Sequence, residues 1–256
     1  MEATILSNIQ VTGPGALQPT FRMELAWPAA SGVRPGQFVH LQVPGVYLRR
    51  PISVAEVSGE DRIVLYYKVV GEGTCLMAGL PEGQSLDVLG PLGNGFPMEE
   101  ITAAGRPVLL LGGGIGAAPM LETAKVLKKS GADVAAVLGF GTADEIILKD
   151  ELAALNVPTF IATMDGSEGT KGTVIDAIKE NGLAGAEAAS PLILACGPTP
   201  MLRAVQAEFT EGYVSLEARM ACGIGACMGC VVKTTEDERV RVCKDGPVFP
   251  LGKVVL

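Results

Sequence analysis

Four cysteines near the C-terminus have the residue type and the spacing that could bind iron. Cys222, Cys227 and Cys230 follow a C-x4-C-x2-C pattern, and Cys243 comes after twelve further residues. Each iron of a [2Fe–2S] cluster takes two thiolates, so this set predicts a cluster of that type. The residues between the first three cysteines are mostly Gly and Ala, which let peptide N–H groups approach sulfur.

Two other interpretations of these cysteines stay open. Zinc also accepts four thiolates, but its usual pattern has two C-x2-C pairs, and this stretch has one. The thiols could also be unrelated core residues. We favour iron–sulfur because the spacing and the small residues of the loop both agree with it.

Composition limits the classes of protein that remain. The chain has 256 residues, of which 48% are hydrophobic and 19% charged, enough for two compact domains and a small appendage. Its formal net charge is −8 and it has no basic tract, so we expect neither nucleic acid nor a membrane as a partner. The longest apolar run, 107–121, is too short to span a bilayer.

Cysteine and histidine usage adds two expectations. Six cysteines and no cationic segment in residues 1–4 predict reduced thiols or metal ligands, and therefore a cytoplasmic protein. The single histidine, His40, lies in the alternating run 38–43. We expect it on a strand face and not as a ligand.

The chain steps through three compositions, which predict three domains at 1–100, 101–212 and 213–256. In the first, short apolar stretches alternate with Gly/Pro turns, as in a small antiparallel barrel or sandwich. We predict strands at 4–11, 21–27, 37–43 and 62–70, and a short helix at 74–78. Two stretches there could bind phosphate: Arg-Pro-Ile-Ser at 50–53 and Gly-Glu-Gly-Thr at 71–74, at the start of the helix.

The second part alternates strands and helices, which predicts a doubly wound parallel sheet with a ligand crevice at the strand ends. Its first strand, 108–111, runs into the glycine-rich turn 112–119. Glycines in such a turn serve close packing as often as phosphate binding. The remaining elements that we predict are strands at 133–138, 159–163 and 192–195, and helices at 120–130, 149–155, 174–181 and 200–209.

Residues 50–53, 71–74 and 80–96 together resemble the flavin domain of the ferredoxin–NAD(P)+ reductase superfamily, which is a barrel. The resemblance implies that Arg50 holds the FAD pyrophosphate and that Ser53 lies near flavin N5. One departure is Ile52, where most relatives have an aromatic residue that stacks on the flavin. The contacts with FAD that the resemblance implies are those of Arg50, Pro51, Ile52, Ser53, Tyr67, Lys68, Val69, Gly73 and Thr74.

The middle of the chain resembles the nucleotide domain of the same superfamily, in the turns 113–119 and 196–201. In relatives the cysteine of the second turn, here Cys196, lies beside the nicotinamide; an ordinary buried thiol is the alternative. Loop 139–145 has acids and no Arg or Lys, which favours NAD over NADP. The resemblance implies NAD contacts for Gly113, Gly114, Gly116, Pro119, Cys196, Gly197 and Pro198.

The order of these parts, with the tail 216–243 of the form Leu-Glu-x-Arg-Met-Ala-Cys…Cys, resembles electron-transfer subunits of the dihydroorotate dehydrogenase B type. The resemblance implies FAD, a [2Fe–2S] cluster and NAD, and an FMN-containing catalytic subunit as partner, in a heterotetramer with two of each. Electrons from dihydroorotate would pass through the cluster and FAD to NAD+ in pyrimidine biosynthesis, with no catalytic acid or base in this chain.

Several alternatives share parts of this architecture. Electron-transfer subunits of sulfide dehydrogenases, sulfhydrogenases and transhydrogenases have the same order of parts. A stand-alone NADH:acceptor reductase would need no FMN partner. A zinc-stabilised binding module would carry no redox cofactor and would be colourless.

Overall fold

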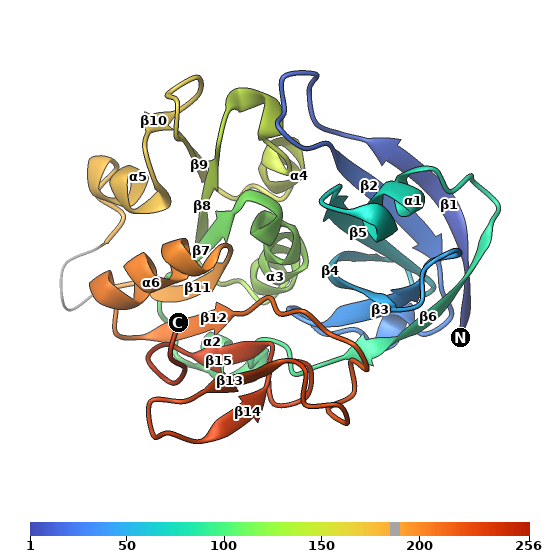
Figure 1. The fold of residues 1–256 in the computed structure, drawn as a ribbon. Helices are drawn as coiled ribbons and strands as arrows, with labels where there is room; N and C mark the ends of the chain where they lie inside the picture. The colour runs from blue at the N-terminus through green and yellow to red at the C-terminus, as the bar shows by residue number, and fades with distance from the viewer. Residues whose placement is uncertain (185–189) are drawn as a thin grey trace.

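The N-terminal part of the chain is a closed antiparallel barrel (Figure 1). The computed structural model describes residues 1–184 and 190–256. The barrel strands are β1 (Glu2–Gln10), β2 (Thr20–Ala26), β3 (Phe38–Gln42), β4 (Arg50–Ser58), β5 (Arg62–Lys68) and β6 (Ser85–Leu92). They pair in the order β1-β2-β5-β4-β3-β6, with the 3-10 turn η1 (Ala30–Gly32) before β3 and the helix α1 (Glu72–Ala78) after β5.

Residue alternation separates the interior of the barrel from its outer face. In β3, Val39 and Leu41 belong to the core that fills the barrel. Because successive side chains of a strand point to opposite sides, Phe38 and His40 face outward. Phe38 packs there in a second core, which the C-terminal part of the chain shares.

The middle of the chain is a seven-stranded sheet in the order β10-β9-β8-β7-β11-β12-β15, parallel except for β15. Its strands are β7 (Val108–Gly113), β8 (Val134–Phe140), β9 (Thr159–Thr163), β10 (Thr170–Lys171), β11 (Leu192–Cys196), β12 (Gly212–Ser215) and β15 (Val248–Pro250). Strand β7 is buried along its whole length, as its apolar run predicts for a central parallel strand.

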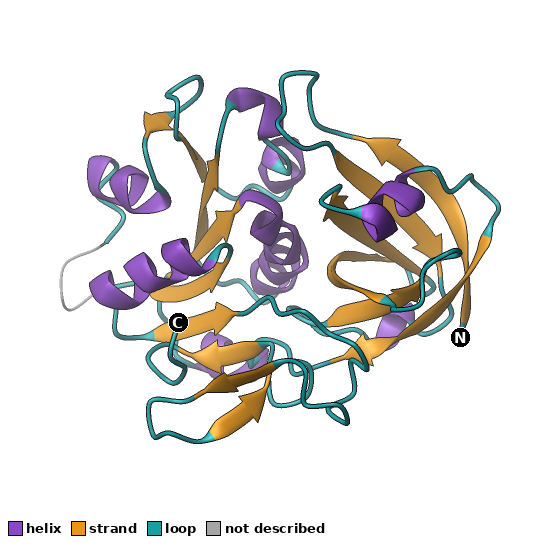
Figure 2. Ribbon diagram, in the orientation of Figure 1, coloured by secondary structure: helices purple, strands orange, loops and turns teal. Residues whose placement is uncertain are grey.

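Helices cover both faces of this sheet (Figure 2). One face shares a core with the barrel and with α2 (Met98–Ala103), α3 (Ala118–Lys129) and α4 (Lys149–Ala154). The other face packs against α5 (Val174–Glu180) and α6 (Thr199–Glu208). Short 3-10 turns, η2 (Gly114–Ala117) and η3 (Ala143–Glu145), follow β7 and β8 at their carboxyl ends.

The C-terminal part contains a two-stranded sheet, β13 (Val231–Lys233) with β14 (Arg239–Arg241). The chain then returns to the large sheet, where β15 pairs with β12. The fold class predicted from the sequence is confirmed: a barrel, a doubly wound sheet and a small C-terminal module. The division into domains at residues 100 and 212 stays a prediction. Residues beyond 212 also contribute to the large sheet, through β12 and β15.

No helix in the described ranges is long and apolar enough to cross a membrane.

Candidate functional site

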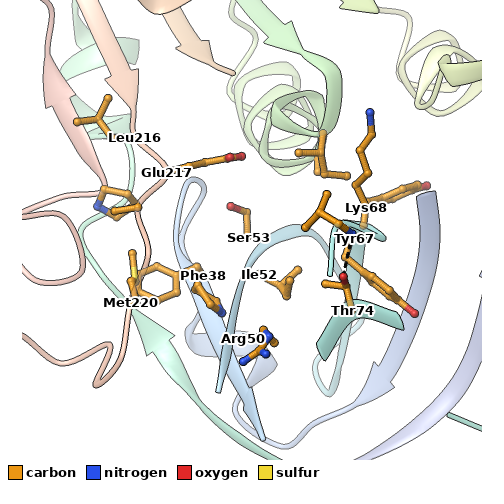
Figure 3. Close-up of a pocket in the computed structure, with 17 residues that line it drawn as sticks. Phe38, Arg50, Ile52, Ser53, Tyr67, Lys68, Thr74, Leu216, Glu217 and Met220 are labelled. Atoms are coloured by element: carbon orange, nitrogen blue, oxygen red, sulfur yellow. Dashed lines mark hydrogen bonds between the residues drawn. The ribbon is translucent and has the colours of Figure 1, made fainter. Parts of the chain in front are cut away.

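A cavity of about 310 Å³ lies where the barrel, the large sheet and the C-terminal segment meet (Figure 3). Strands β4 and β5 supply one wall, the start of α3 another, and the segment after β12 the third. The lining residues are Phe38, Arg50, Pro51, Ile52, Ser53, Tyr66, Tyr67, Lys68, Val70, Thr74, Ile115, Ala118, Leu216, Glu217, Ala218, Met220 and Pro247. We call this cavity the central pocket.

Most residues expected to contact FAD line the central pocket, and two do not. Arg50, Pro51, Ile52, Ser53, Tyr67, Lys68 and Thr74 are in its wall. Val69 is not; its N–H donates to the carbonyl of Pro19 (2.9 Å), and Val70 takes its place in the lining. Gly73 also lies outside the lining, although it touches Arg50.

The wall at Arg50 places a guanidinium against the start of α1. A Cβ on Gly73 would collide with the Arg50 guanidinium, so only glycine lets this cation lie against the start of α1. The Thr74 hydroxyl instead holds the turn: it accepts from the N–H groups of Val70 (2.9 Å) and Gly71 (3.2 Å) and donates to the Gly71 carbonyl (3.0 Å). Thr74 therefore shapes this wall through the backbone.

Glu217 is the acidic group of the pocket, and the sequence analysis did not assign it a site. Its side chain extends from the C-terminal segment into the space that Ser53 borders (Figure 3). The residue is exposed because the pocket is open. Partial loss of water around the carboxyl nevertheless raises the pKa of Glu217. Burial, with the nearby charge of Glu217, also raises the pKa of the Cys196 thiol, and Ser215 donates a counteracting hydrogen bond. Cys196 is buried and lines neither this pocket nor the one at the strand ends.

A second cavity, of about 300 Å³, lies at the carboxyl ends of β7 and β8, and we call it the strand-end pocket. Gly113, Gly114 and Pro198 line it, as expected for NAD contacts. Gly116, Pro119, Cys196 and Gly197 do not. The full lining is Lys68, Gly113, Gly114, Gly139, Phe140, Gly141, Glu145, Met164, Gly172, Thr173, Val174, Pro198 and Met201.

The two glycine-bearing turns of the sheet pack directly against each other. A Cβ on Gly116 would clash with the backbone of Cys196 and Gly197, and one on Gly113 would lie 2.5 Å from the Met201 sulfur. These glycines serve close packing, which positions the turns that border the pocket. Gly113 also lines the strand-end pocket, whereas Gly116 does not.

Lys68 lines both pockets, so the two are adjacent. Its Nζ lies 3.8 Å from a carboxylate oxygen of Glu145, which also accepts from the Gly141 N–H (3.2 Å). Loop 139–145 contains no Lys or Arg, but Lys68 of the barrel strand β5 lies beside it. Glu145 neutralises that cation at the mouth of the strand-end pocket.

The loop that holds the cysteines directs peptide N–H groups at sulfur. The Gly225 N–H donates to Cys243 Sγ (3.1 Å), and the amides of Ala226 and Cys227 donate to Cys222 Sγ (3.3 and 3.4 Å). The amides of Gly229 and Cys243 donate to the sulfurs of Cys227 and Cys230 (3.4 Å each). Hydrogen bonds of this kind stabilise negative charge on the ligating sulfurs of a cluster.

The four thiols form two interacting pairs. Burial acts to raise the pKa of Cys222, but amide hydrogen bonds and the Cys227 thiol outweigh it and lower that pKa to about 6. Burial, with the neighbouring Cys230, raises the pKa of Cys243 to about 12. In the described ranges no three Cys, His, Asp or Glu side chains surround one metal position.

Sequence reasoning missed the third wall of the central pocket. Leu216, Glu217, Ala218 and Met220 form it, and they immediately precede the first cysteine. The Leu-Glu-x-Arg-Met-Ala pattern marked this segment as typical of a family but did not show which way it faces. Phe38, Ile115 and Pro247 were also missed, because each reaches the pocket only through tertiary packing.

Together, a barrel with a cationic pocket, a parallel sheet with a glycine-rich turn and a sulfur-lined loop define an NAD-linked oxidoreductase of the reductase type with an iron–sulfur domain. Residues 110–207 match the oxidoreductase NAD-binding domain. Residues 217–255 match the iron–sulfur cluster binding domain of dihydroorotate dehydrogenase B. These matches agree with the cysteine and turn motifs of the sequence.

Whole-chain relatives give the family. The electron transfer subunit of dihydroorotate dehydrogenase B (NAD(+)) from Bacillus velezensis is 46% identical over 230 residues, 87% of each chain. The subunit of that name from Bacillus cereus is 45% identical over 232 residues, again 87% of each. The chain belongs to this family of electron transfer subunits, as the resemblance predicted. An electron transfer subunit functions together with a catalytic partner subunit.

Solved structures agree on the fold. The NADH-dependent reduced ferredoxin-NADP oxidoreductase, described for flavin-based electron bifurcation, superposes with a TM-score of 0.83 at 30% identity, covering 98% of this chain and 89% of that one. A ferredoxin NADP+ reductase from Neisseria gonorrhoeae with bound FAD and NADP superposes with a TM-score of 0.66 at 20% identity, covering 81% and 89%. The second likeness concerns the fold alone.

Proposed function

We propose that this chain carries electrons from an FMN-containing dihydroorotate dehydrogenase subunit to NAD+ in pyrimidine biosynthesis, within a cytoplasmic heterotetramer of two copies of each subunit. A [2Fe–2S] cluster bound at the four cysteines would exchange single electrons, and FAD in the central pocket would convert these to the hydride that NAD+ accepts. A cytoplasmic location would keep the four thiols reduced.

One observation carries this proposal: the three candidate sites are contiguous. The segment from Leu216 to Met220 walls the central pocket and leads within two residues to Cys222. Lys68 borders both the central and the strand-end pocket. An electron carrier needs such adjacency, whereas a module that binds nucleotide as a regulator does not.

The residues of the central pocket would bind and orient the flavin. Arg50 offers a guanidinium for the pyrophosphate. Ile52 and Phe38 present apolar surface where the ring would lie, and they exclude water from it. Ser53 and Glu217 also line the pocket and could hydrogen-bond a ring edge. No acid–base pair is required of this chain, because proton removal from dihydroorotate would belong to the partner.

The cluster loop would face that partner. Ile224 and Met228 are 55% and 53% exposed, and Cys227 is exposed beside them. Apolar side chains next to ligands of a cluster suit a docked protein surface, which would also shorten the distance to the partner's FMN.

The test uses the purified full chain and the FMN subunit. We expect a yellow-brown protein that contains FAD, two irons and two sulfides per chain, and whose flavin is reduced by NADH. Mixed with its partner, it should support NAD+-dependent oxidation of dihydroorotate. A protein without iron or acid-labile sulfide after anaerobic reconstitution would contradict the proposal.

The bifurcating relative favours one alternative, since it resembles this chain over almost its whole length at 30% identity. In that case the chain would serve another NAD(P)H-linked complex. The alternative would be supported if the protein oxidised NADH at full rate with electron acceptors other than the FMN subunit, and if the FMN subunit did not increase that rate.

A further inference from the structure

His40 is a buried polar side chain for which the proposed function has no use. It is fully buried, and in the described chain neither ring nitrogen has a hydrogen-bond partner. Leaving a buried polar group without a partner destabilises the folded state, so such a group signals a missing interaction.

The ring lies against the first peptide of the cysteine loop. A Cβ on Gly223 would be 2.6 Å from His40 Nδ1 and 3.2 Å from Cε1, so only glycine allows this approach. Burial and the Arg49 charge lower the pKa of His40, while the backbone carbonyls of Arg49 and Cys222 act in the other direction. In this structure neither carbonyl accepts a hydrogen bond from the ring.

His40 also stands directly behind the central pocket. On β3 it pairs with Pro51 of β4, and Pro51 lines that pocket. Two positions earlier, Phe38 lines the pocket as well and packs in the core that contains Cys230 and Cys243. The outer face of β3 is therefore the surface on which the cysteine loop rests.

We propose that His40 is a positioning residue that ties the Cys222–Gly223 peptide to the barrel through a ring N–H donated to the Cys222 carbonyl, so fixing the loop amides that donate to sulfur. The inference rests on the proposed function, because it presumes a cluster at these cysteines. Fixing that peptide keeps the amides of Ala226 and Cys227 aimed at Cys222 Sγ. Such amides favour the reduced cluster, so they raise its reduction potential.

The experiment compares His40→Phe, which keeps the ring shape and removes both nitrogens, with His40→Gln, which keeps a donor. Full-length protein with reconstituted cluster and bound FAD is used. We expect His40→Phe to lower the cluster midpoint potential by a tenfold change in its reduction equilibrium, about 59 mV for one electron. Its EPR spectrum should change too, and His40→Gln should restore most of the shift. Equal potentials and spectra in wild type and His40→Phe would overturn the inference.

A second measurement decides the question if His40→Phe fails to fold. Gly223 and Gly225 are both in the left-handed region (φ 70° and 81°), but Gly225 faces Lys244 and not the imidazole. A double-mutant cycle of His40→Gln with Gly223→Ala should show coupling in the midpoint potential, and the same cycle with Gly225→Ala should not. Equal coupling in both cycles would overturn the inference. A wild-type protein that binds no cluster would instead contradict the proposed function.

Discussion

The cysteine loop and the central pocket are built in opposite ways. In the loop, three of the four sulfurs come from nine consecutive residues, and amides of the same short stretch donate to them. In the pocket, residues as distant as Phe38, Ile115 and Glu217 meet only because β3, the turn η2 and the C-terminal segment pack together. A local site is decided by its own backbone, whereas an assembled site is decided by the whole fold.

This contrast predicts that damage to the loop stays in the loop. Cys227→Ser should remove one of the two thiolates of an iron and reduce electron transfer between the two subunits by about 100-fold or more. Reduction of the flavin by NADH should remain measurable, because no residue of the central pocket changes. Stopped-flow absorbance at flavin and cluster wavelengths separates the two steps.

Cys75→Ser is the matched control for Cys227→Ser. Cys75 is also an exposed cysteine, but it lies in α1, away from the loop. If both substitutions abolished transfer, or if Cys227→Ser also abolished flavin reduction in a folded protein, the separation of the two sites would be wrong.

The same contrast explains how far the sequence could predict the molecule. The four cysteines could be read from their spacing, and many strand and helix positions followed from apolar periodicity and Gly/Pro turns. The barrel strands β4 and β6, the helix α2 and the short strands after residue 211 were not predicted. The direction in which the side chains of residues 216–220 point could not be predicted. Nothing in the local sequence shows that they line a pocket whose other walls come from the barrel and the start of α3. Lys68 illustrates the same limit: its position in β5 was predicted, but its contact with Glu145 depends on how barrel and sheet dock.

Val69 gives a second example of the same limit. Tyr67, Lys68 and Val69 were expected to line the flavin site together. The side chain that lines it is that of Val70, after β5 has ended at Lys68 and the chain has started to turn. The sequence predicts the strand, but not the residue at which its alternation stops.

Within the central pocket, a single substitution should weaken flavin binding without touching the cluster. Arg50→Gln removes the guanidinium beside Gly73, and a lost hydrogen bond to a charged group costs about 1.5–3 kcal/mol, which is roughly a 10- to 150-fold weaker affinity for FAD. Fluorescence titration of the deflavinated protein measures this.

Arg49→Gln is the control for Arg50→Gln, one residue away. Arg49 pairs with Asp87 and donates to the carbonyl of His40 (3.3 Å), and it does not line the pocket. It should keep near wild-type affinity for FAD. Equal losses in both variants would show that net charge, and not a pocket contact, controls binding.

A substitution in the strand-end pocket should have a smaller effect, because the charge of Lys68 there is paired with that of Glu145. Glu145→Gln leaves Lys68 uncompensated at the pocket mouth, where it would attract a 2′-phosphate. Because such pairs contribute about 0.2–1 kcal/mol, we expect the preference for NADH over NADPH to fall roughly two- to five-fold. The ratio of kcat/KM values for flavin reduction measures it.

Asp144→Asn removes the same charge from the neighbouring position, which is exposed and lies outside the pocket lining. It should leave the preference unchanged. A shift as large as that of Glu145→Gln would mean that the overall field of the acidic loop, and not the pair with Lys68, selects the nucleotide.

The smallest effect is expected at the seam that holds barrel and sheet together behind the central pocket. Glu122 of α3 is buried and accepts from the Val57 N–H of β4 (2.8 Å), and burial raises the pKa of its carboxyl. A carboxyl whose pKa is raised by folding favours the folded state below its unfolded value, near 4.5, and loses that contribution as pH rises through the folded value. Glu122→Gln keeps an acceptor for Val57 and removes the charge.

This substitution should therefore raise the free energy of unfolding at pH 8, by up to about 1 kcal/mol, and make no difference at pH 4. Urea unfolding at the two pH values tests this, and a variant less stable at pH 8 would show that the ionised carboxylate, paired with Lys125 (3.9 Å), stabilises the seam.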